Sequence, residues 1–219
     1  MNTLTTLAPL LDRLFDEAAA AEPATRAAVA HLSDGEVERL MRSKTGYLDF
    51  YGSLKDFPLA VSRETGRLLY MLARSCGARA VVEFGTSFGL STLHLAAALR
   101  DNGGGILITG EFEPSKAARA RQNLTDGGLI DLVELREGDA LQTLRSDLPE
   151  TVDMILLDGA KALYPEILSL TESRLRPGAL VLADDAEHSP DYLAHVRSPA
   201  AGYLSARLSE GIEMSMRLG

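Results

Sequence analysis

The sequence contains very little cysteine and no tryptophan. Cys76 is the single cysteine among 219 residues, so no intramolecular disulfide can form. A disulfide framework is typical of small secreted proteins, and its absence favours a reducing, cytoplasmic location. Cys76 lies at the end of a helical apolar pattern, so we expect it to serve in packing.

Long apolar runs are also missing from the sequence. No apolar stretch reaches the roughly 18 residues that a transmembrane helix needs, so we expect no membrane span. Near the N-terminus, Asp12 and Arg13 interrupt the leucines, and we therefore predict no signal peptide.

Basic residues are fewer than acidic ones. Lys and Arg together number 22 against 31 Asp and Glu, which gives a net charge of −9. Nucleic acids and anionic membranes attract clustered Lys and Arg, so neither is expected as a partner. The length and the 46% hydrophobic content suit a single domain over residues 1–219. Within it we predict an N-terminal helical region at 1–58, which serves as a lid or in a dimer, and a core at 59–219.

One stretch, residues 80–92, organises the rest of the prediction. Residues 80–84 are a short apolar run, which indicates a strand buried on both faces. Gly85 and Gly89 follow, and glycine permits a tight turn and a close approach of a ligand. A helical pattern then begins at Ser91. Ligands of open α/β sheets bind at such a turn, beyond the carboxyl end of the strand.

The glycine spacing distinguishes between classes of cofactor. A dinucleotide fingerprint would require glycines at 85, 87 and 90, whereas the chain has Ser87 and Leu90. The pattern is E-x-G-x-x-x-G instead, which disfavours an NAD(P)-dependent oxidoreductase.

Further strands alternate with helical patterns along the chain. Alternation of this kind predicts a doubly wound parallel sheet. The last apolar residues change to a period of two around the turn at 209–211, which predicts an antiparallel hairpin at the sheet edge. The further strands are expected at 106–110, 132–135, 152–157, 179–183, 204–208 and 212–218.

The stretch Glu83-Phe-Gly-Thr-Ser-Phe-Gly-Leu-Ser91 resembles the E-[IL]-G-x-x-x-G-[YL]-S motif of the catechol and caffeoyl-CoA O-methyltransferases. These are class I enzymes that use S-adenosyl-L-methionine. The resemblance implies an α/β fold with a Rossmann-like, doubly wound, seven-stranded, mostly parallel sheet. It also implies a C-terminal antiparallel hairpin and extra N-terminal helices.

The resemblance implies a cofactor site at the carboxyl ends of the strands. Glu111 follows the second strand and is expected to hold the ribose, with Glu113 as the alternative. Asp139 either contacts the adenine or caps a helix, whereas Ser62 can both cap a helix and contact the cofactor carboxylate. The predicted cofactor contacts are Val61, Ser62, Glu83, Gly85, Ser87, Gly89, Ser91, Glu111, Asp139, Ala140 and Asp158.

Three aspartates are expected to meet where two central strands end. Asp158 follows one strand, and Asp184 and Asp185 follow the next. Their charges repel one another unless a cation neutralises them, and carboxylate oxygens suit Mg²⁺. The family patterns D-x-x-K-x-x-Y and D-N match Asp158, Lys161, Asp184 and its neighbour, except that Asp185 replaces the usual Asn.

Together these features predict a metal-dependent O-methyltransferase acting on a small catechol-like acceptor. Asp158, Asp184 and Asp185 are the predicted metal ligands, and Lys161 is the predicted general base. A lysine can act as the base only if its pKa falls from about 10.4 toward neutrality. The other alternative is a degenerate methyltransferase fold that serves as a binding subunit, which intact Lys161 and the three acids disfavour.

Other segments leave alternatives open. The aromatic stretch 49–59 forms either a lid over a planar acceptor or ordinary packing, and the leucine stripe at 4–14 is expected to be buried partly in a homodimer. Segment 189–198 resembles the catechol enzymes, but no acid near 203–209 matches the one that holds their second hydroxyl. His188 and His195 are expected to be ordinary surface or packing residues.

Overall fold

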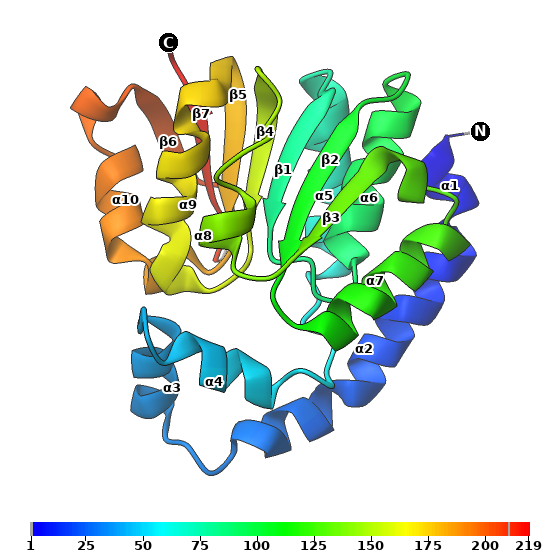
Figure 1. Ribbon diagram of the computed structural model, residues 1–219, viewed down its shortest axis with the longest axis vertical. Helices are drawn as coiled ribbons and strands as arrows, with labels where there is room; N and C mark the ends of the chain where they lie inside the picture. The colour runs from blue at the N-terminus through cyan, green and yellow to red at the C-terminus, as the bar shows by residue number, and fades with distance from the viewer. Residues whose placement is uncertain (1, 210) are drawn as a thin grey trace.

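The computed structural model describes residues 2–209 and 211–219 and contains a seven-stranded sheet with helices on both faces (Figure 1). The strand order is β3-β2-β1-β4-β5-β7-β6, and neighbours from β3 to β5 are parallel. β7 pairs antiparallel with both β5 and β6, which confirms the predicted fold class. The strands are β1 (Ala80–Phe84), β2 (Ile106–Glu111), β3 (Val133–Glu137), β4 (Val152–Leu157), β5 (Leu175–Ala183), β6 (Tyr203–Arg207) and β7 (Glu213–Arg217).

Helices precede the sheet and connect its strands. α3 and α4 lie beyond the carboxyl ends of the central strands (Figure 1). None of the described helices combines the length and the apolar character needed to cross a bilayer. The α-helices are α1 (Thr3–Thr6), α2 (Ala8–Val29), α3 (Asp34–Met41), α4 (Tyr47–Ser53), α5 (Arg63–Ser75), α6 (Leu90–Asp101), α7 (Pro114–Asp126), α8 (Ala140–Thr143), α9 (Tyr164–Thr171) and α10 (Pro190–Val196).

The sheet separates two hydrophobic clusters. Val81 and Leu107 belong to one cluster, whereas their sequence neighbours Val82 and Ile108 belong to the other. Successive side chains of a strand point to opposite faces, so a continuous apolar run fills both clusters. The central strands are therefore covered on both sides, as the sequence predicts.

The N-terminal leucine stripe is buried within its own chain. Leu7, Leu11, Leu14 and Phe15 belong to the cluster that also contains α5 and α6. This packing removes the stripe as a reason to expect a dimer, because the apolar surface is already covered.

Glu83 is a fully buried carboxylate at the centre of the sheet. It pairs in register with Thr109 of β2, whose hydroxyl donates to Glu83 at 2.6 Å. Ser91 and Thr92 of α6 donate to the same carboxylate at 2.6 and 2.7 Å. Burial raises the pKa of Glu83, whereas the three hydroxyl donors oppose that rise. Glu83 therefore ties the start of α6 to β1 and β2.

The C-terminal hairpin forms as predicted, and it buries polar as well as apolar residues. On the apolar alternation, Ile212 is buried and Met214 packs against the core, whereas Leu204 and Met216 are 65% and 38% exposed. Glu213 and Ser215, at the alternate positions, are buried. Their polar groups are satisfied, because Arg197 donates twice to Glu213, at 2.8 and 2.7 Å, and the two serines of the hairpin lie 2.8 Å apart. Glu210 of the predicted turn lies outside the described residues.

Several element boundaries also differ from the predicted ones. Ile130–Leu132 forms a 3-10 turn, so the third strand begins and ends later than expected. β5 begins at Leu175, four residues before the expected start. The helix before β1 starts as predicted, because Ser62 accepts a hydrogen bond from Thr65 N at 3.0 Å.

The contact between α5 and α6 yields a stability prediction. A Cβ at Gly66 of α5 would lie 2.6–2.9 Å from ring atoms of the buried His94 on α6. G66A should lower the free energy of unfolding by about 1–3 kcal/mol, because overpacking outweighs the gain in helix propensity. Urea denaturation measures this change.

G52A is the matched control for this prediction. Gly52 also lies in a helix, but nothing lies within 4 Å of the Cβ that it would gain. It should be neutral or stabilising by up to about 1 kcal/mol. Equal unfolding free energies for the two variants would show that α5 and α6 do not pack this closely.

Candidate active site

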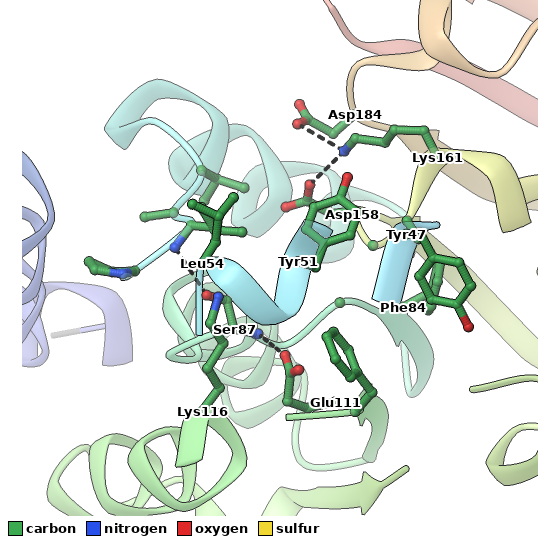
Figure 2. A pocket seen from close by; sticks show the side chains of 18 of the residues that line it. Tyr47, Tyr51, Leu54, Phe84, Ser87, Glu111, Lys116, Asp158, Lys161 and Asp184 are labelled. Carbon is green, nitrogen blue, oxygen red and sulfur yellow. Dashed lines mark hydrogen bonds and ion pairs between the residues drawn. The ribbon is translucent and has the colours of Figure 1, made fainter. Parts of the chain in front are cut away.

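A cavity of about 630 Å³ lies at the carboxyl ends of the central strands, covered by α4 (Figure 2). Gly85, Glu111, Asp158 and Asp184 reach it from the ends of four different strands. Parallel sheets bind ligands in this position. The cavity therefore brings together most of the residues predicted from the sequence.

The glycine turn after β1 is shaped by its contact with β4. Gly85 has φ +104°, and a Cβ there would lie 2.6 Å from the carbonyl oxygen of Asp158. Only glycine permits both this backbone conformation and this close approach. Ser87 is held in the left-handed region at φ +48°, which directs its N–H toward Glu111.

Glu111 is fixed at the cavity wall by two backbone donors. Its carboxylate accepts from Ser87 N at 2.8 Å and from Glu113 N at 2.9 Å. Burial raises the pKa of Glu111, and these two hydrogen bonds oppose that rise. Glu113, the predicted alternative, is the N-cap of α7 and does not line the cavity. Glu111 is thus the acid that is placed to meet a ligand.

Asp139, Ala140 and Val61 also line the cavity. Asp139 caps α8 by accepting from Leu141 N at 2.9 Å, so the capping alternative holds whether or not adenine binds there. The loop that carries Val61 is tied to the glycine turn, because Leu59 N donates to the Ser87 hydroxyl at 3.1 Å. The adenine and carboxylate contacts of this wall stay predictions.

Four predicted cofactor contacts do not line the cavity. Ser91 donates a hydrogen bond to Glu83 at the start of α6, and Ser62 caps α5. Gly89, at φ +86°, begins α6 and faces Ala120. None of these four residues is among those that line the cavity, so their contacts with a cofactor stay predictions.

Lys116 is a cavity residue that the sequence did not reveal. It lies on α7, is 4% exposed and lines the cavity with Glu111. Burial lowers its pKa, although the charge of Glu111 opposes that effect. A lysine on an otherwise polar helix gives no sign in the sequence that it is buried, so only the packing of α7 shows it.

Lys161 stands among the three predicted carboxylates. Its Nζ lies 3.2 Å from Asp158, 3.7 Å from Asp184 and 3.8 Å from Asp185. No group of three or more His, Cys, Asp or Glu side chains in the described part of the chain is arranged to hold a metal ion by itself. The carboxylates converge on the ammonium instead, which is the cation present at this point.

The charges of this cluster shift the pKa values of its members. Burial raises the pKa of Asp158, and burial together with the charge of Asp158 raises the pKa of Asp184 to about 7. Burial alone would lower the pKa of Lys161, but attraction to its negative neighbours outweighs burial and raises it well above its usual value. A general base needs a lowered lysine pKa, so the role of Lys161 as the base stays a prediction that depends on compensation of this negative charge.

The backbone conformation at the end of β5 explains why Asp185 can replace the Asn that is usual in the family. Asp185 has φ +47°, a left-handed conformation that Asn and Asp adopt more readily than other side chains. The Tyr164 hydroxyl donates to the Asp184 carbonyl at 2.8 Å and fixes the same turn. The third residue of the D-x-x-K-x-x-Y pattern thus supports the cluster from behind.

The helix α4 presents an aromatic stripe to the cavity. Tyr47, Phe50, Tyr51 and Leu54 recur at helical spacing, and all four line the cavity. Phe50 and Tyr51 belong to the stretch that we expected as lid or packing, whereas Phe57 does not reach the cavity. Burial raises the pKa of Tyr51, which lies close to Lys161 and Asp158.

The two histidines considered in the sequence lie outside this cavity. His195 Nε2 lies 3.3 Å from Glu172, and its ring packs edge-on against Tyr203. His188 lines a separate small pocket. Their expected role as ordinary packing residues agrees with these positions.

Comparisons with known proteins agree with this geometry. Residues 82–186 match a family described as a methyltransferase domain. Catechol O-methyltransferase B of Danio rerio is 30% identical over 211 residues, which cover 89% of this chain and 77% of that protein. A catechol O-methyltransferase of Niastella koreensis is 38% identical over 130 residues, 58% of each chain. The match thus spans less than two thirds of that second protein.

Solved structures show the same likeness. The O-methyltransferase TomG of Streptomyces achromogenes, in complex with SAM, has a TM-score of 0.64 and 27% identity, over 85% of this chain and 96% of that one. The O-methyltransferase of Bacillus cereus, in complex with SAH, has a TM-score of 0.63 and 25% identity, over 84% and 96% of the two chains.

The fold and the cavity define a class I methyltransferase. More closely, the chain belongs to the catechol O-methyltransferase family of S-adenosylmethionine-dependent O-methyltransferases. This membership replaces the NAD(P) alternative that the glycine spacing already disfavoured.

Glu111 yields the cofactor prediction. E111A should weaken adenosylhomocysteine binding by about 1.5–3 kcal/mol, the scale of a hydrogen bond to a charged group. Isothermal titration calorimetry measures the dissociation constant. E113A is the control and should change it little, because Glu113 only caps α7. A larger loss in E113A than in E111A would transfer the ribose contact to Glu113.

Proposed function

We propose that this chain is a divalent-metal-dependent O-methyltransferase that acts on a small aromatic acceptor with two neighbouring hydroxyl groups. The observation that carries the proposal is the cluster at the cavity wall, where Lys161 Nζ lies within 3.8 Å of three carboxylates. The names of the catechol O-methyltransferases among its relatives support the same acceptor class.

The donor set of the cluster suits Mg²⁺ or another hard divalent cation. Asp158, Asp184 and Asp185 offer carboxylate oxygens, which such ions prefer. Three carboxylates lie around one ammonium, and burial is the largest cause of the raised pKa values of Asp158 and Asp184. When bound there, the cation would supply positive charge that lowers the pKa of nearby hydroxyl groups.

Lys161 has the role of proton acceptor in the proposed reaction. The acceptor oxygen forms a bond to the methyl carbon of S-adenosylmethionine while the carbon–sulfur bond breaks. The bonding electrons pass to sulfur and leave neutral adenosylhomocysteine, and the hydroxyl proton passes to Lys161 Nζ. Lys161 takes a proton only in its neutral form, so the negative charge that now raises its pKa must first be compensated.

The remaining residues orient the two reactants. The glycine turn and Glu111 hold the cofactor on one side, and Asp158, which touches Gly85, holds the acceptor side. Holding two reactants in a near-attack geometry can contribute roughly 7–11 kcal/mol to a reaction of this type. α4 covers the cavity and limits the access of water.

Three further expectations remain proposals. A homodimer is no longer supported by the leucine stripe, because the chain buries that stripe itself. A cytoplasmic location rests on the single cysteine alone. The division into regions 1–58 and 59–219 is our interpretation of the sequence.

The metal dependence yields a direct prediction. Removal of divalent cations with EDTA should abolish methylation of catechol, whereas adenosylhomocysteine affinity should change less than about twofold, because neither the glycine turn nor Glu111 belongs to the carboxylate cluster. Radiolabelled methyl transfer and calorimetry measure the two quantities, and added Mg²⁺ should restore turnover. Full activity in excess EDTA would place this chain with the metal-independent methyltransferases.

Lys161 yields a second prediction. K161M should bind cofactor normally but lose about 10²–10⁴-fold in the rate of methyl transfer, the contribution of a general base. The loss should shrink as pH rises, because the acceptor hydroxyl then ionises without help.

D185N is the matched substitution in the same cluster. It restores the residue usual in the family and keeps a side chain that tolerates the left-handed backbone at this position. Its rate should stay within about threefold of the unmodified chain. A K161M enzyme as fast as D185N would remove Lys161 from the mechanism.

A further inference from the structure

A vicinal diol has two oxygens, and one of them must be chosen for methylation. The Lys161 cluster lies beside the oxygen that reacts, so a different group has to recognise the second oxygen. The family resemblance would place an acid near residues 203–209 for this purpose. No described residue of that segment lines the cavity. Glu213, a buried acid of the hairpin, already accepts hydrogen bonds from Arg197 and Ser205.

Tyr51 of α4 also lines the cavity, close to Asp158 and Lys161. In Figure 2 its side chain extends from α4 toward Asp158 and Lys161. None of the hydrogen bonds drawn among the residues of Figure 2 involves its hydroxyl. A phenol that faces the reacting cluster with its hydroxyl available can bind an oxygen atom of the acceptor.

We propose that Tyr51 is a specificity-determining residue of the acceptor site. Its hydroxyl hydrogen-bonds to the acceptor oxygen that is not methylated, and this contact sets which of the two hydroxyls reacts. The inference rests on the proposed function and adds to it the group that determines regiochemistry.

Two properties of Tyr51 suit this role. A phenol hydroxyl both donates and accepts, so it can meet a neutral or an ionised acceptor oxygen. Its helix is also tied to the core on both sides. Before α4, Arg42 donates to the Glu187 carbonyl at 3.3 Å and Lys44 pairs with Glu166. After α4, Leu59 N donates to the Ser87 hydroxyl at 3.1 Å.

These contacts join α4 at both ends to segments beside the cavity, which Tyr51 and Lys161 both line. An unsymmetrical diol can bind in two orientations, which exchange the oxygen beside Lys161 with the oxygen beside Tyr51. The hydrogen bond to Tyr51 favours one orientation over the other, because substituents on the ring make the two oxygens chemically different. The ratio of the two methylated products therefore reports on this contact.

The test uses 3,4-dihydroxybenzoate as the acceptor, with Mg²⁺ and S-adenosylmethionine. The 3-O- to 4-O-methyl product ratio is measured by liquid chromatography for the unmodified chain and for Y51F. Y51F should change the ratio by about 3–10-fold and raise KM more than it lowers kcat, the effect of one lost neutral hydrogen bond. Its affinity for adenosylhomocysteine and its Tm should stay unchanged.

Y47F is the matched control. Tyr47 lies one turn earlier on α4 and lines the same cavity, but its charged neighbour is Asp139 at the other end. Its product ratio should equal that of the unmodified chain. Equal shifts in Y47F and Y51F would overturn the inference, because they would indicate a general effect of the lid.

Three other outcomes are decisive. Glu210 is the acid of the predicted hairpin turn and lies outside the described residues. If E210Q changes the product ratio and Y51F does not, the second oxygen would be assigned to Glu210 and the inference overturned. If the unmodified chain methylates the acceptor and Y51F does so with the same product ratio and the same KM, the inference would also be overturned. A chain that methylates no dihydroxyarene with any divalent cation would overturn the proposed function, and the inference with it.

Discussion

The backbone contact between Gly85 and Asp158 is the constraint on which the site depends. Gly85 follows β1 and Asp158 follows β4, and a Cβ at Gly85 would lie 2.6 Å from the Asp158 carbonyl oxygen. The two strands can end side by side only because glycine has no side chain. The glycine turn and the carboxylates therefore share one wall of the cavity. In the proposed function, methyl donor and acceptor meet at this wall.

Electrostatics divides this wall into two parts. Around the glycine turn, Glu111 is held by two backbone N–H groups, and the hydroxyls that satisfy Glu83 lie behind the turn. Around Lys161, three carboxylates lie within 3.8 Å of a single ammonium. The carboxylate of Glu111 thus has hydrogen-bond donors from the protein itself. The three aspartates around Lys161 carry more negative charge than one ammonium compensates, and a bound cation would relieve this imbalance.

The sheet and much of the site follow from local patterns in the sequence. The apolar runs at β1 and β4 and the glycine spacing at 85 and 89 specify strands, a turn and a class of cofactor. Acids that directly follow parallel strands must lie at one edge of the sheet, so Glu111, Asp158 and Asp184 could be placed together without coordinates. The Ser62 cap was also predictable, because an N-cap depends only on residues a few positions away.

The sequence by itself thus determined the fold class, the family and the acids at the strand ends, because these depend on short-range periodicity and on the geometry of parallel strands. The tertiary structure decided which side chains face the cavity. It turned Glu83 inward beneath α6, buried the polar face of the hairpin and placed Lys116 beside Glu111. It also brought Tyr51 close to Asp158 and Lys161. Each of these outcomes depends on how two elements distant in sequence pack against each other, and no local pattern encodes that packing.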